Sequence, residues 1–213
     1  MSERTGCFEE IERAFRAAAQ VLEEARVPYM LGGSLAAWVR GGPESCNDLD
    51  LIIRLDDADR ALAAFDRAGM RTERPAEGWL VKAWFDDILI DLIFKPMGME
   101  IGQEVFERAK PASAWGVPVL AMDLDDVMVS KLLSMDEHDL DFEPALQIAR
   151  ALREKLDWAQ IRARTAVSPY ARAFLTLLEQ LELLPRSVPA RPDQPRIRVA
   201  TTGHEPAEAS DSA

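Results

Sequence analysis

Residues 27–54 read VPYMLGGSLAAWVRGGPESCNDLDLIIR, and this stretch decides the fold. Its pattern predicts a short apolar strand, a Gly-Gly-Ser turn, a short helix, a loop and a second strand. The second strand begins with Asp48 and Asp50. Side chains two residues apart in a strand point to the same face, about 6.6 Å apart along the strand. Because two carboxylates on one face repel each other unless a cation lies between them, the pair indicates a cation site.

The turn that precedes the short helix is suited to an anion. Gly32, Gly33 and Ser34 lie where this helix begins, and glycines allow backbone N–H groups to approach a bound anion closely. An anion cradle beside a pair of cation-binding carboxylates suggests a site for a metal-bound nucleotide.

A third carboxylate lies inside an apolar strand. From residue 70 onward the pattern predicts three strands, at residues 70–74, 79–85 and 88–94. Residues 86–87 form a two-residue connection, so the last two strands should pair as a hairpin. Asp91 is the only charge in the segment ILIDLIF, and a buried carboxylate is costly unless it is paired or binds a metal. We therefore expect Asp91 to join Asp48 and Asp50 from an adjacent strand.

The rest of the chain is mainly helical in its pattern. Apolar spacing and end signals predict helices at residues 8–26, 34–40, 56–68, 102–109, 123–135, 141–156, 158–165 and 169–184, and an extended segment at 115–121. Either Asp56 or Asp57 can cap the third of these helices. Residues 186–213 contain four prolines and no aromatic residue, which predicts a disordered tail.

These elements predict an α+β protein. Its first part, residues 1–121, is a small mixed β-sheet core with flanking helices. A helical C-terminal part follows at residues 122–185, and the tail at 186–213 lies outside both.

Lys131 lies in the middle of the apolar side of the helix predicted at 123–135. At about 100° per residue, it shares that sector with Leu124, Val127, Met128, Leu132 and Met135. A lysine there is costly unless its ammonium reaches solvent or meets an anion. In one alternative, the ammonium extends to solvent or pairs with Asp125 or another helix. In the other, it contacts the triphosphate held by the Gly-Gly-Ser turn. His138 would lie on the same side if the helix continued that far.

Length, charge and cysteine usage exclude several classes of protein. The 213 residues allow one well-buried domain, or one domain with a small helical extension. A net charge of −12 argues against broad binding to DNA or RNA, although it permits a local basic groove. No apolar run approaches the ~20 residues of a membrane helix, and the acidic N-terminus does not resemble a signal peptide. Cys7 and Cys46 cannot make a disulfide framework and fit a reducing cytoplasm.

We interpret the tryptophans as core or groove wall rather than a base-stacking platform, with Trp38 and Trp84 the two that could border the nucleotide.

Together, Gly-Gly-Ser, the Asp48-Leu49-Asp50 motif and the distal Asp91 resemble the DNA polymerase beta-type nucleotidyltransferase superfamily. The similarity is closest to its small stand-alone bacterial branch, which includes antibiotic nucleotidyltransferases and enzymes of abortive-infection and toxin–antitoxin systems. Members of that branch often carry, in the helical part, a lysine followed by a basic residue and aspartates, which Lys131 and residues 138–141 match. The resemblance spans residues 25–141.

The resemblance implies that a hydroxyl group attacks the α-phosphate of an NTP, so that NMP is transferred and pyrophosphate leaves. The residues it places at the nucleotide are Gly32, Gly33, Ser34, Arg40, Lys131 and His138. The residues it makes catalytic and metal-binding are Asp48, Asp50 and Asp91, which would hold two Mg²⁺ ions, or Mn²⁺ in their place. Asp91 would also take the proton of the acceptor hydroxyl, and Lys131 would neutralise the departing pyrophosphate.

Two departures from the family pattern concern basic residues. Many members have an arginine or lysine shortly before D-x-D, where this loop has Glu44; nearby Arg40 either substitutes for it or caps its own helix. His138 replaces the more usual arginine or lysine. Two other functions therefore stay open, a non-catalytic nucleotide-binding module and an interaction protein that docks a cognate protein partner. The acceptor, whether a small molecule, an RNA end or a protein, is not readable from the sequence.

Overall fold

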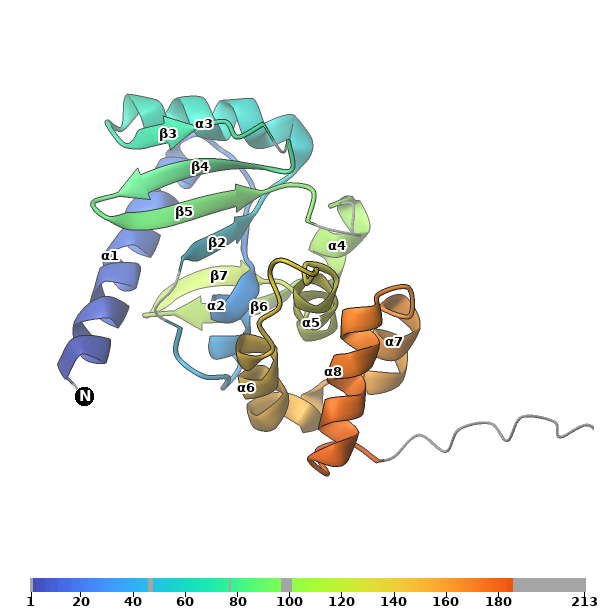
Figure 1. The fold of residues 1–213 in the computed structure, drawn as a ribbon. Helices are drawn as coiled ribbons and strands as arrows, with labels where there is room; N and C mark the ends of the chain where they lie inside the picture. Colours follow the sequence, from blue (N-terminus) through green and yellow to red (C-terminus); the bar gives the residue numbers. More distant parts are fainter. Residues whose placement is uncertain (1, 46–47, 77, 97–100, 186–213) are drawn as a thin grey trace, which may run out of the picture.

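The computed structural model describes residues 2–45, 48–76, 78–96 and 101–185 of the chain (Figure 1). A mixed sheet with helices packed against it forms the first part, and a group of helices follows. The α+β class expected from the sequence is confirmed. The tail expected at 186–213 lies outside the described residues, as does Cys46.

The helices are α1 (Ser2–Glu24), α2 (Gly33–Trp38), η1 (Leu55–Asp57), α3 (Ala58–Arg67), α4 (Gln103–Arg108), α5 (Leu124–Leu133), α6 (Glu143–Leu152), η2 (Arg153–Lys155), α7 (Trp158–Arg164) and α8 (Pro169–Gln180). The strands are β1 (Met30–Leu31), β2 (Leu49–Ile52), β3 (Arg71–Glu73), β4 (Leu80–Phe85), β5 (Ile88–Ile93), β6 (Lys110–Ala114) and β7 (Val117–Ala121). They form one sheet in the order β3-β4-β5-β2-β1-β7-β6.

The strands expected around the hairpin are confirmed. In β4 and β5, Phe85 lies opposite Ile88, so Asp86 and Asp87 form the two-residue connection. Asp86 takes the positive φ of 50° that a tight hairpin turn requires. This turn fixes the register of every pair along the two strands.

The strand β6 was not expected from the sequence. The extended segment predicted at 115–121 is the second arm of a hairpin, β7, and β6 is the first arm. Trp115 and Gly116 join them with φ values of 48° and 81°, the pair of positive angles typical of a type I′ turn. Because β6 is a small and polar edge strand that contains Pro111, its pattern carries little strand signal.

Helix ends differ from the predicted ones at three places. The helix expected at 141–156 is divided into α6 and η2, and the one expected at 56–68 begins with the 3₁₀ turn η1. Asp57 precedes α3, but its carboxylate accepts from Arg60 (2.5 Å) rather than from the helix backbone. α5 ends at Leu133, five residues before His138, so the apolar side of that helix does not extend to His138.

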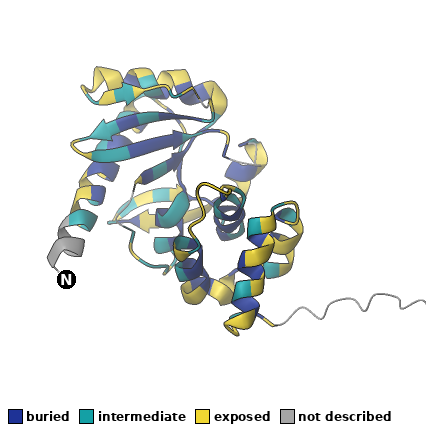
Figure 2. Cartoon of the chain, viewed as in Figure 1, coloured by how far each residue is buried: buried dark blue, intermediate teal, exposed yellow. Residues whose placement is uncertain are grey.

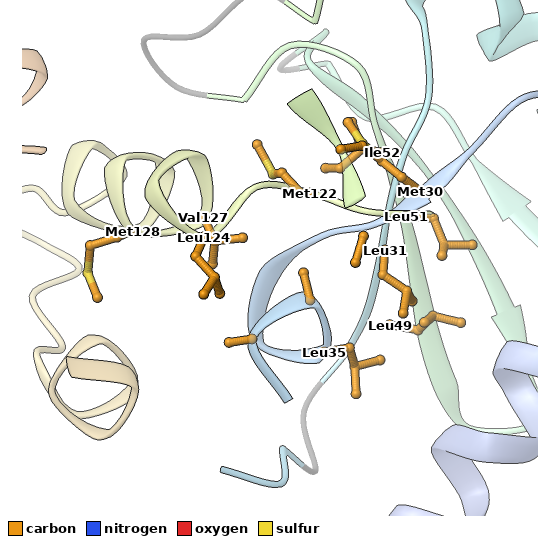
Figure 3. Packing of buried hydrophobic residues seen from close by; sticks show 14 of the residues in the cluster. Met30, Leu31, Leu35, Leu49, Leu51, Ile52, Met122, Leu124, Val127 and Met128 are labelled. Carbon is orange, nitrogen blue, oxygen red and sulfur yellow. The ribbon is translucent and has the colours of Figure 1, made fainter. Parts of the chain in front are cut away.

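The core lies on both faces of the sheet. Helices α1 and α3 contact β2, β3, β4 and β5, while α2 contacts β2 on one side and α5 on the other. Phe15 and Phe65 are fully buried in the first of these layers. Figure 2 shows the buried residues along the inner sides of these elements, and Figure 3 shows labelled side chains from α2, α5, β1 and β2 within the same core. The site residues therefore stand on elements that are fixed by packing.

A buried ion network joins the two parts of the chain. Asp126 of α5 is fully buried, accepts two bonds from Arg108 of α4 (3.0 and 2.9 Å) and one from Arg164 of α7 (2.6 Å). A buried carboxylate needs such partners, since an unpaired one is strongly destabilising. The network thereby fixes α5 against its neighbours on both sides.

None of the helices in the described part of the chain is long and apolar enough to cross a bilayer.

Candidate functional site

Asp50 of β2 and Asp91 of β5 lie directly beside each other as register partners of two parallel strands. Their side chains therefore share one face of the sheet. Asp91 is only 8% exposed, and burial raises the pKa of both carboxyls to about 6. The exposed Asp48 raises both pKa values further by like-charge repulsion. The structure thus brings the three expected carboxylates to one place.

One oxygen of this group has no partner. Oδ1 of Asp91 is buried and accepts no hydrogen bond from any residue that the structure describes. Such an atom costs free energy unless something binds it. A cation at Asp50 and Asp91 would satisfy this oxygen and offset the burial of two negative charges.

The Gly-Gly turn is packed against the same carboxylate. Gly33 has a φ of 49°, and a Cβ added there would lie 1.8 Å from Oδ2 of Asp50. A Cβ on Gly32 would lie 2.8 Å from Cδ1 of Ile52, and the amide of Gly32 donates to the carbonyl of Asp50 (2.9 Å). Residue 33 therefore has no room for a side chain unless Asp50 moves, and the start of α2, whose first N–H groups have no partner within the helix, is held beside the carboxylates.

Lys131 reaches this group from α5. It is partly buried, and its positive charge lowers the pKa of Asp50, against the larger effect of burial. The ammonium thus faces the aspartates rather than bulk solvent alone. Beside it lies a cavity of about 200 Å³ lined by Lys131, Ser134, Met135, Asp139, Asp141, Pro144 and Ala145.

Arg40 and His138 have other surroundings. The guanidinium of Arg40 donates to carbonyl groups of Ala36 (3.3 Å), Ala121 (2.8 Å) and Met122. It therefore caps α2 and ties it to the segment before α5, which is the structural alternative that the sequence left open. The side chain of His138 is 85% exposed and lies 3.3 Å from Glu137. The sequence places both residues at the nucleotide, and the structure shows neither beside the carboxylates.

The sequence analysis missed Lys82. It is partly buried on β4, directly opposite Asp91 in the antiparallel pair, and its charge lowers the pKa of that carboxyl. The signal was present: a two-residue turn at 86–87 pairs Phe85 with Ile88, and counting back along both strands places Lys82 opposite Asp91.

The carboxylates of Asp50 and Asp91 are suited to one kind of divalent-cation site. Within the described ranges, no group of three or more His, Cys, Asp or Glu side chains is gathered as a ready-made metal site. Magnesium, however, is usually held by one or two carboxylates together with substrate phosphates. Asp50 and Asp91, with an unpartnered oxygen and raised pKa values, fit a cation of that kind.

Comparison with protein families agrees with this geometry. A family model described as nucleotidyl transferase of unknown function (DUF2204) matches residues 11–175. The chain belongs to this family. The matched DUF2204 region contains the Gly-Gly turn, the three aspartates and Lys131. A comparison with curated proteins gives no match.

Solved structures share the fold of this DUF2204 protein at low sequence identity. The antibiotic-resistance factor ANT(2'')-Ia, in solution, is 15% identical with a TM-score of 0.57, covering 79% of this chain and 94% of its own. The same factor in complex with adenylyl-2''-tobramycin is 15% identical with a TM-score of 0.57, and the match covers 79% of this chain and 98% of that one. A nucleotidyltransferase-like protein from Paracoccidioides brasiliensis is 13% identical with a TM-score of 0.50. This match covers 81% of this chain and 88% of that one. These similarities confirm the nucleotidyltransferase fold.

Proposed function

We propose that the protein is a metal-dependent nucleotidyltransferase that transfers NMP from an NTP to a hydroxyl group and releases pyrophosphate. The observation that carries the proposal is the Asp50–Asp91 pair, with Asp50 packed against a Gly-Gly turn whose residue 33 has no room for a side chain while Oδ2 of Asp50 is in place. Family membership supports a nucleotidyl transferase in general. The pair and the turn support this specific chemistry, because one binds cations and the other leaves room for phosphate oxygens.

Each residue has a defined part in this proposal. The turn at Gly32 and Gly33 and the hydroxyl of Ser34 hold the terminal phosphates through N–H and O–H donors. Asp91, beside Asp50 on the adjacent strand, takes the proton of the acceptor hydroxyl as general base. Lys131 stabilises the negative charge that develops on pyrophosphate as it leaves.

In this proposal, Asp50 and Asp91 would hold the divalent cations together with Asp48 and the substrate phosphates. When bound, the cations supply positive charge to the phosphate oxygens and lower the cost of the charge that develops during transfer. Mg²⁺ is the proposed ion, with Mn²⁺ as a substitute.

The test is transfer of label from each of four α-labelled NTPs to a panel of acceptors in the presence of Mg²⁺. The panel contains total RNA, aminoglycosides such as the tobramycin adenylylated in the ANT(2'')-Ia complex, and the protein itself. Asp50→Asn should abolish transfer without unfolding the protein, whereas Asp66→Asn, an exposed acid on α3, should leave it unchanged. Transfer that survives Asp50→Asn would refute the proposal.

A second function, NTP binding without turnover, is favoured by one observation. Arg40, the nearest candidate for the family's basic residue before D-x-D, is bound to carbonyl groups instead. A regulatory module would bind NTP and Mg²⁺ with an affinity that depends on Asp50, yet transfer no label to any acceptor. A toxin–antitoxin type interaction protein would instead co-purify with a cognate partner at fixed stoichiometry. Calorimetric titration with NTP, beside the transfer assay, separates the two functions.

A further inference from the structure

Lys82 belongs to a row of charged residues that crosses the sheet. Asp50 pairs with Asp91, Asp91 with Lys82, and Lys82 with Glu73, each directly opposite the next on adjacent strands. Residues that are directly opposite share a face. Starting from the carboxylates, the first side chain toward β3 is therefore a cation.

A second row runs parallel to the first, one same-face step further along β4. Trp84 stands two residues from Lys82, about 6.6 Å along the strand, and Arg71 of β3 lies opposite it. The guanidinium of Arg71 is stacked on the ring of Trp84, with Cζ 3.8 Å from the ring centroid. Lys82, Trp84 and Arg71 form what we call the β4 platform, next to Asp91.

The β4 platform is accessible. Helices α1 and α3 pack on the opposite face of these strands, where Val81, Ala83 and Ile90 are buried. Arg71 is exposed, and Lys82 and Trp84 are partly exposed. A cavity of about 560 Å³ opens at the end of the platform, lined by Ala68, Gly69, Met70, Arg71, Trp84, Phe85, Asp86 and Asp87.

The charged side chains around the β4 platform are arranged by sign. Cations stand nearest to the reacting carboxylates, while the acids Asp86 and Asp87 stand at the far rim, where Asp86 lies 3.7 Å from Arg13. Glu73, directly opposite Lys82 on the edge strand β3, is exposed. If an acceptor presents its hydroxyl to Asp91, the acceptor group next to that hydroxyl lies beside the ammonium of Lys82. This position suits a phosphate and disfavours an amine.

The flat surface of Trp84 and Arg71 adds a second requirement. Bases of nucleic acids stack on aromatic rings and on arginine planes. Trp84, on which Arg71 is stacked, offers such a surface, and it is one of the two tryptophans that could border the nucleotide. Trp38, in contrast, packs on the rings of Phe8 and Trp115.

We propose that the β4 platform is the acceptor subsite and that the acceptor is a nucleotide, either free or as the 3′ end of an RNA strand. Trp84 and Arg71 stack the base, and Lys82 binds the phosphate next to the terminal ribose. This inference rests on the proposed function. The ribose hydroxyl oxygen forms a bond to the α-phosphorus of the NTP, the bond from that phosphorus to the β-phosphate oxygen breaks, the proton passes to Asp91, and pyrophosphate leaves.

Binding can be tested without turnover. The probe is a fluorescent oligoribonucleotide of about 12 nucleotides with a blocked 3′ end, titrated with the full chain and followed by anisotropy. Lys82→Met and Arg71→Met should each weaken binding about tenfold, and Trp84→Ala by a similar factor. Lys110→Met on β6 and Arg150→Met on α6, which remove exposed cations elsewhere, should leave it unchanged. Equal losses in the control variants would overturn the platform, because binding would then depend on total charge alone.

Transfer then identifies the source of the nucleotide. Label should appear on an oligoribonucleotide with a free 3′ end or on AMP, and not on an oligoribonucleotide that ends in a 3′-phosphate. Lys82→Met should raise the KM for that acceptor and leave the KM for NTP unchanged. Label on tobramycin alone, unaffected by Lys82→Met, would overturn the nucleotide acceptor while keeping the proposed function. Absence of all label, with oligoribonucleotide binding that still requires Lys82, would refute the proposed function and support the platform.

Discussion

Oδ2 of Asp50 fills the space that a side chain on residue 33 would need, since a Cβ added to Gly33 would lie 1.8 Å from it. The Gly-Gly turn and the carboxylate of Asp50 are therefore in direct contact. The carbonyl of Asp50 also accepts the amide of Gly32, one residue before α2 starts at Gly33. In the proposed function, this contact would place a bound phosphate next to a bound cation.

Replacement of Gly33 by alanine tests this contact, and the chain offers a matched control. Gly33 and Gly69 both have positive φ values, 49° and 78°, but a Cβ on Gly69 would meet nothing within 4 Å. Both alanine variants carry the backbone strain of about 1 kcal/mol. Gly33→Ala alone displaces Asp50, so we expect it to lose NTP binding and transfer, and to unfold at a lower temperature than Gly69→Ala. Equal behaviour of the two variants in thermal unfolding and NTP titration would contradict the contact.

The two buried carboxyls should make stability depend on pH. Their pKa is about 6 in the folded protein against an ordinary 3.8, so between these values the folded state holds protons that the unfolded state has released. The free energy of unfolding of the cation-free protein should therefore fall as pH rises from about 4 to about 6, and this contribution stays constant above. Thermal unfolding of the wild type, Asp50→Asn and Asp66→Asn across this range measures it.

Asp50→Asn should make the fall in the free energy of unfolding between about pH 4 and about pH 6 less steep, and Asp66→Asn should leave it unchanged. Added Mg²⁺ should stabilise the protein more at pH 8 than at pH 5, because the ion binds ionised carboxylates. A wild-type slope of the opposite sign, or a gain from Mg²⁺ that is independent of pH, would show that these carboxyls are not the ones that titrate.

The sequence was informative where local rules apply. The hairpin of β4 and β5, the alternation that puts Asp48 and Asp50 on one face, and the lone charge of Asp91 each depend on a few neighbouring residues. The pairing of Asp50 with Asp91 was expected because a buried carboxylate needs a partner, although the parallel register that provides it is a property of the sheet.

What the sequence did not provide depends on distant contacts. Lys82 is an exception, because it lies in the strand predicted at 79–85 and the predicted turn at 86–87 already places it opposite Asp91. Arg40 could have been a phosphate contact, and only the positions of the carbonyls of Ala121 and Met122, more than 80 residues away in the chain, show that it ties α2 to the segment before α5. β6 was missed because its strand pairing comes from its neighbour and not from its own residues.

The buried network at Asp126 should be a large determinant of stability. Asp126→Ala leaves Arg108 and Arg164 without their shared carboxylate and empties a fully buried position, so we expect a loss of about 3 kcal/mol in the free energy of unfolding. Arg108→Ala should cost less, because Arg164 still pairs with the carboxylate. The exposed pair of Asp59 and Arg74 is the control, and Asp59→Ala should cause no measurable change in urea unfolding. A negligible effect of Asp126→Ala would show that the network does not hold α5 in place.

Lys131 distinguishes a phosphate contact from a lysine that merely reaches solvent. Lys131→Met keeps the apolar stem on the buried side of α5 and removes the charge, so folding should be retained. If the ammonium binds the triphosphate, the Kd for NTP should rise roughly tenfold or more, whereas Lys110→Met should leave it unchanged. Because Lys131 lowers the pKa of Asp50, its loss should also move the pH midpoint of Mg²⁺ binding upward, and this second measurement does not depend on the nucleotide. An unchanged Kd together with a raised midpoint would place Lys131 beside the carboxylates but not at the phosphates, and no change in either would leave it as a lysine that reaches solvent.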